Sequence, residues 1–149
     1  LGLIAVFPSV AAGILFLRGE AMNKQAILSD DAPAPIGPYS QATRVGDWIF
    51  ISGQIPIDPS TGELVPGGIA AQTRQVLQNL QAVLTAVGLN LDSIVKTTIY
   101  LTDLTMFSEM NEVYATYFCP PYPARATVEV RALPKGAQVE IEAIAYAGG

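Results

Sequence analysis

Residues 69–88 carry the sequence pattern that most constrains the fold. In IAAQTRQVLQNLQAVLTAVG, apolar side chains recur at the spacing of one helix face, while glutamine, arginine and asparagine fill other positions. The apolar positions of this face are Val76, Leu77, Leu80, Val83, Leu84 and Val87. Gly88 follows as a natural C-terminal stop. Since an apolar helix face must be buried against another layer, the rest of the chain has to supply that layer.

Most of the remaining segments have the composition of β-strands. Residues 40–45 and 48–55 are rich in β-branched and aromatic residues around Gly46-Asp47, which predicts a hairpin. A second amphipathic helix is predicted after Asp103 or Thr105, either of which could cap it. The predicted order is β-β-α-β-α-β-β, with segments at 40–45, 48–55, 69–88, 93–102, 105–118, 125–133 and 138–147. This order predicts an α+β domain with both helices on one face of a mixed, mostly antiparallel sheet.

The last two predicted strands flank the turn Pro134-Lys135-Gly136, and we expect them to pair as an antiparallel hairpin. Alternation gives each strand a small apolar side and a charged side. The small apolar side, which we expect the helices to cover, comprises Ala126, Val128, Val130, Val139, Ile141, Ala143 and Ala145. The other side comprises Arg125, Thr127, Glu129, Arg131, Gln138, Glu140, Glu142, Ile144 and Tyr146. Because this side mixes charges with apolar groups, we expect a homo-oligomer to cover it.

Composition excludes several classes of function. A chain of 149 residues with 50% hydrophobic content is the size of one compact domain. Its net charge of −5 and scattered basic residues argue against binding to nucleic acid. Without histidine, it can build neither a histidine metal site nor a Ser-His or Cys-His nucleophile. Its one cysteine, Cys119, cannot form an internal disulfide, so we interpret it as structural and expect a cytoplasmic protein.

The first 21 residues differ in character from the rest. The stretch LGLIAVFPSVAAGILFL is apolar for 17 residues, contains Pro8 and has no basic region before it. It is short for a membrane span and poorly formed as a signal peptide. We expect Met22 to be the natural start and residues 1–21 to be a non-family extension, with a membrane anchor as the alternative. A single domain is expected at 22–149, without stable membrane association.

Two kinds of charged side chain on the final strands are candidates for chemistry. Arg125 has a rigid fork of donors suited to binding a carboxylate or phosphate at two points. The alternative is a cross-strand ion pair with Glu140 or Glu142, which contributes little when exposed. A carboxylate such as Glu140 could orient or deprotonate water, or it could be part of an ordinary solvated strand. The pattern of residues alone leaves both alternatives open.

Several stretches taken together resemble the Rid (YjgF) family over roughly residues 26–147. They are APAPIGPYSQA, ISGQIP, IVKTTIYLTDL, MNEVYATYF, PARATVEV and VEIEAIA. The resemblance implies a chorismate-mutase-like α+β fold and a homotrimer with clefts between its subunits. It also implies hydrolysis of reactive 2-imino acids, such as 2-iminobutanoate and 2-iminopropanoate, to 2-keto acids and ammonia. No metal or cofactor is implied, because a 2-iminium is already electrophilic and needs only a positioned carboxylate and water.

The resemblance also assigns roles to individual residues. Arg125 matches the family arginine that holds the substrate carboxylate, and Glu140 matches the carboxylate proposed to position the attacking water. Thr127 falls where many deaminating members carry cysteine. Other substrate-binding cleft positions are matched by Tyr39, Ser52, Gly53 and Asn111.

The sequence leaves other functions open. A non-catalytic ligand-binding or regulatory protein could share the fold and the cleft. The pair of Arg125 and Glu140 favours the enzyme, since a carboxylate binder has no need of a water-positioning acid. An RNA-acting or chaperone-like relative is a further alternative, although the acidic composition weighs against specific RNA binding.

Overall fold

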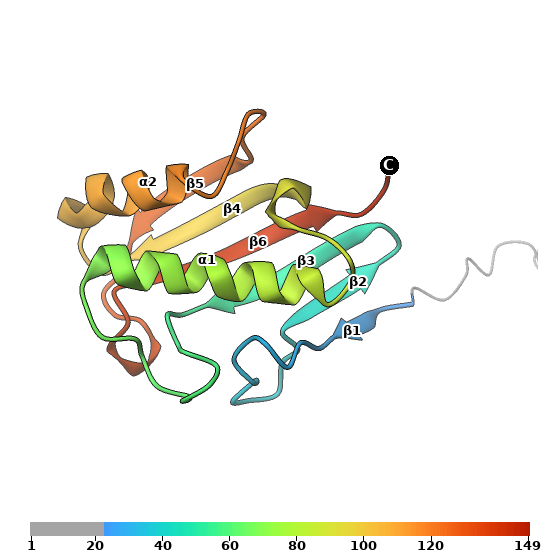
Figure 1. Cartoon of the computed structure of the whole chain (residues 1–149), viewed down its shortest axis with the longest axis horizontal. Coiled ribbons are helices and arrows are strands. Elements are labelled where there is room, and N and C mark those ends of the chain that lie inside the picture. The colour runs from blue at the N-terminus through green and yellow to red at the C-terminus, as the bar shows by residue number, and fades with distance from the viewer. Residues whose placement is uncertain (1–22) are drawn as a thin grey trace, which may run out of the picture.

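The computed structural model describes residues 23–149, so the expectations for residues 1–21 and for a start at Met22 lie outside the described residues. Two α-helices pack on one face of a single mixed sheet, as Figure 1 shows, which confirms the predicted fold class. The strands are β1 (Gln25–Ile27), β2 (Ala42–Val45), β3 (Trp48–Gln54), β4 (Ile94–Leu101), β5 (Ala124–Glu129) and β6 (Val139–Tyr146). The helices are α1 (Ile69–Thr85) and α2 (Phe107–Ala115). The short strand β1 adds a sixth strand to the predicted order.

Helix α1 supplies the main contact between the helical layer and the sheet. The apolar positions predicted at its centre are buried, and Val76, Leu77 and Leu80 have no exposed surface. They belong to one core cluster with Ile49 of β3 and Ile141 of β6. Each such side chain contributes roughly 1.5–3 kcal/mol of stability by leaving water. The chain leaves the helix through Gly88, whose positive φ of 75° suits a residue without a Cβ.

Helix α2 begins after a short 3-10 turn, η3 (Leu104–Met106), and covers the β4–β5 side of the sheet (Figure 1). Asp103 caps this turn, since its Oδ1 accepts a hydrogen bond of 2.8 Å from the backbone N–H of Thr105. Helix α2 itself has Met106 at its N-cap, without a side-chain hydrogen bond, so the prediction that Asp103 or Thr105 caps the helix is wrong; Asp103 caps the turn before it. The helix buries Met110, Val113 and Tyr114, as its periodicity predicts.

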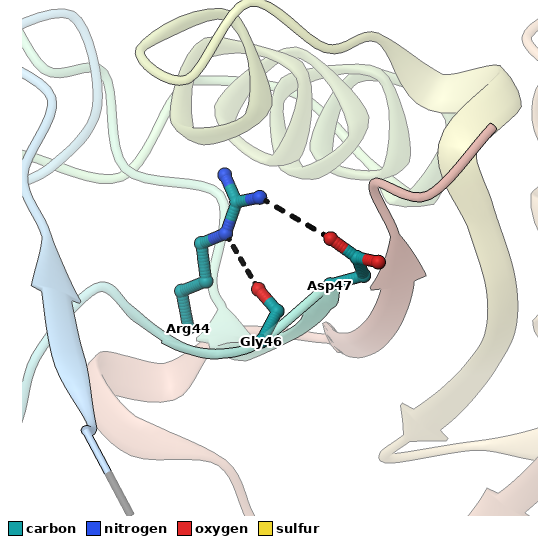
Figure 2. Close-up of polar contacts among 3 residues, drawn as sticks. All are labelled: Arg44, Gly46 and Asp47. Carbon is teal, nitrogen blue, oxygen red and sulfur yellow. Dashed lines mark hydrogen bonds and ion pairs between the residues drawn. The ribbon is translucent and has the colours of Figure 1, made fainter. Parts of the chain in front are cut away.

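The predicted hairpin at Gly46-Asp47 is present between β2 and β3. Gly46 has a φ of 58°, and its carbonyl accepts a 2.8 Å hydrogen bond from Nε of Arg44 (Figure 2). Nη2 of Arg44 also lies 3.7 Å from Oδ1 of Asp47. An exposed pair of this kind contributes about 0–1 kcal/mol, so the glycine conformation dominates the turn.

The predicted antiparallel pairing of the last two strands is wrong. The sheet order is β1-β2-β3-β6-β4-β5, so β6 lies between β3 and β4 and is antiparallel to both. Strand β5 is at the edge and pairs in parallel with β4. The Pro134-Lys135-Gly136 turn exists as a 3-10 turn, but it carries the chain past the end of β4. A turn signal fixes where the chain changes direction and leaves open which strands become neighbours.

The parallel pairing also reverses the expected orientation of β5. Arg125 is the register partner of Thr97, which is buried and hydrogen-bonded to Tyr114 of α2. Arg125 and Thr127 therefore face the helical layer, while Ala126 and Val128 face the other side. In β6 the expectation is confirmed, since Val139, Ile141, Ala143 and Ala145 are buried beneath the helices.

We call the side of the sheet without helices the open sheet face. Its large apolar side chains include Trp48, Phe50, Val128 and Tyr146, each between 42% and 47% exposed. Glu140 and Glu142 of β6 project from the same side. No helix within residues 23–149 has the length and apolar character to cross a membrane.

Candidate functional site

The residues predicted to form the site fall into two groups on opposite faces of the sheet. The arginine half-site comprises Arg125 of β5 and Asn111 of α2, with Tyr114 beneath them. The carboxylate half-site comprises Glu140 of β6 with Tyr39, Ser52 and Gly53. Because β4 and the sheet itself separate them, a single chain does not bring Arg125 and Glu140 together.

In the arginine half-site, α2 holds Arg125 by contacts of two kinds. Nη1 of Arg125 donates a 2.7 Å hydrogen bond to Oδ1 of Asn111. The guanidinium carbon lies 4.8 Å from the centre of the Tyr114 ring and 5.6 Å from that of Phe107. These distances are in the range of cation–π attraction. A cavity of about 510 Å³ adjoins the guanidinium, and Tyr122 and Pro123 line it further.

The charge of Arg125 is not neutralised by the residues around it. Within residues 23–149 the only ion pair closer than 4.0 Å joins Arg44 and Asp47. The alternative of a cross-strand pair with Glu140 or Glu142 within the chain is therefore wrong. Asn111 occupies one of the five N–H donors, and the rest of the fork can bind an anionic ligand from the cavity.

The carboxylate half-site surrounds a second cavity, of about 420 Å³. Its lining comprises Ile36, Tyr39, Ser52, Gly53, Ile55, Pro134, Glu140 and Glu142. The hydroxyl of Ser52 donates a 2.6 Å hydrogen bond to the carbonyl of Ser40, which leaves it as an acceptor toward the cavity. The hydroxyl of Tyr39 accepts a hydrogen bond of 3.3 Å from the backbone N–H of Ile36. All four predicted residues of this group thus line one cavity.

Gly53 leaves free the space that the side chain of Glu140 occupies. The β3–β6 register is interrupted between Ile51 and Gln54, so Gly53 lies in a local irregularity of the sheet. A Cβ at Gly53 would overlap Oε1 of Glu140 and lie only 2.9 Å from its Cδ. Only glycine therefore admits this position of the carboxylate.

The environment of Glu140 makes it a stronger base than an ordinary carboxylate. Burial raises the pKa of Glu140, and the negative charge of Glu142 raises this pKa further. Glu142 is itself held by a 3.0 Å hydrogen bond from the hydroxyl of Tyr100. A carboxyl group with a raised pKa accepts a proton more readily than an ordinary carboxylate does.

Thr127 and Tyr114 depart from the sequence-based expectations. Thr127 lines neither of the two cavities, and its buried hydroxyl has no hydrogen-bond partner among residues 23–149. Tyr114 is not among the residues predicted for the site, yet its ring lies against the guanidinium of Arg125. Its position three residues after Asn111 on the same helix face is the signal that could have placed it in the site.

Comparisons with known proteins agree with this fold. The model of the endoribonuclease L-PSP family matches residues 29–147. A RutC family protein from Pyrococcus horikoshii is 57% identical over 123 residues, covering 83% of this chain and 98% of that protein. The 2-iminobutanoate/2-iminopropanoate deaminase of Mus musculus is 50% identical over 129 residues, covering 87% of this chain and 96% of the enzyme.

Solved structures give the same result. The crystal structure of a Rid family protein of unknown function from Yersinia pestis is 54% identical, with a TM-score of 0.81. The match covers 83% of this chain and 99% of that one. The chain described here therefore belongs to the Rid (YjgF) family.

Proposed function

We propose that this protein hydrolyses 2-imino acids to 2-keto acids and ammonia, in a homotrimer whose sites lie between subunits. Each site joins the arginine half-site of one subunit to the carboxylate half-site of its neighbour. The reaction uses no metal or cofactor and proceeds in the cytoplasm. The proposal is supported by the 50% identity to mammalian enzymes named 2-iminobutanoate/2-iminopropanoate deaminase.

The separation of the two half-sites is the observation that carries the proposal. One face offers a guanidinium without a carboxylate partner, and the other offers a carboxylate with a raised pKa beside an open cavity. Either half alone lacks a group that the reaction needs. A neighbouring subunit can supply it, and the apolar side chains of the open sheet face favour such an association.

The reaction follows from these groups. Arg125 binds the carboxylate of the 2-iminium substrate and fixes the C=N carbon over Glu140 of the neighbouring subunit. Water adds to this carbon while Glu140 accepts one of its protons. In the resulting carbinolamine, Glu140 returns the proton to the nitrogen and the C–N bond breaks to release ammonia. The hydroxyl proton passes to Glu140 as C=O forms.

Two single variants and their mixture test the composite site. Arg125→Ala and Glu140→Gln are each expected to lose turnover of 2-iminobutanoate, generated in a coupled assay and followed as keto acid. Co-refolding equal amounts of the two inactive variants should restore about one quarter of the wild-type sites, by random assortment in a ring of heterologous interfaces. Within one mixed interface, one subunit then supplies Arg125 and the other supplies Glu140.

The outcomes of this experiment separate the claims. Near-normal turnover by Arg125→Ala would remove the proposed chemistry. Inactive single variants whose mixture stays inactive would contradict the inter-subunit site while leaving the chemistry in place. A stable monomer in light scattering would contradict the trimer directly.

The same variants address the alternatives for this family. A non-catalytic ligand-binding protein would bind a keto acid through Arg125 without turnover, and Glu140→Gln would leave that binding unchanged. Salt-dependent cleavage of RNA that is lost in Arg125→Ala would support the activity after which the family model is named. The deaminase is favoured because the absence of a Cβ at Gly53 lets Glu140 take its position beside the cavity. A protein that only binds an anion has no need of a carboxylate there.

A further inference from the structure

Tyr114 connects the buried core of the protein to the guanidinium of Arg125. The side chain is only 5% exposed, and its hydroxyl shares a 2.8 Å hydrogen bond with Oγ1 of the fully buried Thr97. The ring of Phe118 packs against it at 4.4 Å between centroids. Tyr114 is therefore held at its hydroxyl by Thr97 of β4 and along its ring by Phe118, and both of these residues are buried.

This fixed ring lies against Arg125, which is itself exposed. Phe107, Asn111 and Tyr114 recur at helical spacing on one side of α2, and all three contact the guanidinium. Asn111 holds one nitrogen of the group, while the nearer of the two rings, that of Tyr114, lies 4.8 Å from its centre. A single hydrogen bond leaves a flexible side chain free to rotate about it, whereas an aromatic ring also restrains the group as a whole.

We propose that Tyr114 is a positioning residue that holds the Arg125 guanidinium in the orientation that binds the substrate carboxylate. This inference rests on the proposed deaminase function. Tyr114 acts through Arg125 and takes no part in proton transfer. Its ring provides the support, and its hydroxyl only fixes the ring, through Thr97.

The test compares two buried aromatic residues of the same cluster. Tyr114→Leu removes the ring beneath Arg125. The matched control Phe118→Leu removes a neighbouring buried ring that is not among the cation–π partners of Arg125 within residues 23–149. For Tyr114→Leu we expect KM for 2-iminobutanoate to rise about five- to thirty-fold, the range of a cation–π contact, with kcat little changed. Phe118→Leu should change KM less than about twofold at a comparable loss of thermal stability. Tyr114→Phe keeps the ring and should restore KM to within about threefold of wild type.

A double-mutant cycle identifies the route of the effect. Arg125→Lys replaces the planar guanidinium with an ammonium group that stacks less well. We compare the fold-increase in Kd for the product 2-oxobutanoate that Tyr114→Leu causes in each background. In the Arg125→Lys background, this fold-increase should be less than about half of that in the wild type. An equal effect in both backgrounds would overturn the inference, as would equal KM changes in Tyr114→Leu and Phe118→Leu. If Tyr114→Leu does not fold, Tyr114→Met repeats the comparison with a bulkier side chain.

Failure of this inference is distinguishable from failure of the proposed function. Wild-type protein without deaminase activity would remove the function, whatever the Tyr114 variants do. Active wild-type protein, inactive Arg125→Ala and a Tyr114→Leu variant of unchanged KM would remove only the role of Tyr114.

Discussion

Substituting Gly53 with alanine is expected to separate the activity of this protein from its stability. The added Cβ would overlap Oε1 of Glu140 and lie 2.9 Å from Cδ and 3.0 Å from Cγ. Non-bonded carbon atoms need about 3.5 Å or more, so Cδ must retreat by more than about half an ångström, and the oxygen by more. Since the conflicting atoms are the end of a flexible side chain, Glu140 moves and the backbone does not.

The two consequences differ in size. Displacing Glu140 from its rotamer costs about 0.5–1.5 kcal/mol of stability. Moving a catalytic carboxylate by about 1 Å can cost about 10²-fold in rate. That rate loss corresponds to about 2.7 kcal/mol of transition-state stabilisation. Gly53→Ala should therefore fold and assemble like wild type, while kcat falls by about 10- to 100-fold.

The assay measures kcat with 2-iminobutanoate together with the free energy of unfolding in urea. Gly68→Ala is a matched control, because a Cβ there meets no atom within 4 Å and the φ of −90° suits alanine. This control should keep wild-type kcat. A wild-type kcat in Gly53→Ala would refute the claim that the missing Cβ of Gly53 is needed for the position of Glu140. Equal losses of kcat in both variants would show that the effect is not specific to Gly53.

Three other substitutions test the pKa of Glu140, a buried hydrogen-bond network and the open sheet face. Glu142→Gln removes one of the two causes that raise the pKa of Glu140, so the acid limb of the kcat–pH profile should move to lower pH; an unmoved limb would contradict the coupling. Gln41→Ala removes a buried amide that accepts from Ser29 and donates to the carbonyls of Ala32 and Pro33, and should lower the free energy of unfolding by about 1–3 kcal/mol in urea. Phe50→Glu places a charge on the open sheet face and should give monomers in light scattering without turnover; an active trimer would contradict burial of this face.

The sequence predicts those parts of the fold that depend on local patterns. The face of α1 through Leu77 and Leu80 follows from helical periodicity, and the β2–β3 turn follows from Gly46, which adopts a positive φ. In β6 the buried side also follows from alternation, because Ile141 and Val139 are larger and more apolar than anything on the other side except Ile144 and Tyr146.

The orientation of β5 could not be predicted in the same way. Alternation shows that Arg125 and Thr127 share one side, but the other side of this edge strand offers only two alanines and Val128, which is too little apolar surface to fix the buried side. The choice depends on pairing with β4, where Thr97 opposite Arg125 is buried under α2. That contact joins residues far apart in the chain, and no local pattern encodes it.

This single reversal changes how the site has to be built. If β5 paired with β6 as expected, Arg125 and Glu140 would share the charged side of the sheet, and one subunit could hold a complete site. In the structure they point to opposite sides of the sheet, so no side-chain rotation within one subunit can join them. The exposed apolar groups around Phe50 and Tyr146 independently call for a covering partner on the side of Glu140. An association that buries this side against the β5 edge of a neighbour would cover the apolar groups and also place an Arg125 beside Glu140. The mixing experiment therefore tests the fold and the chemistry together.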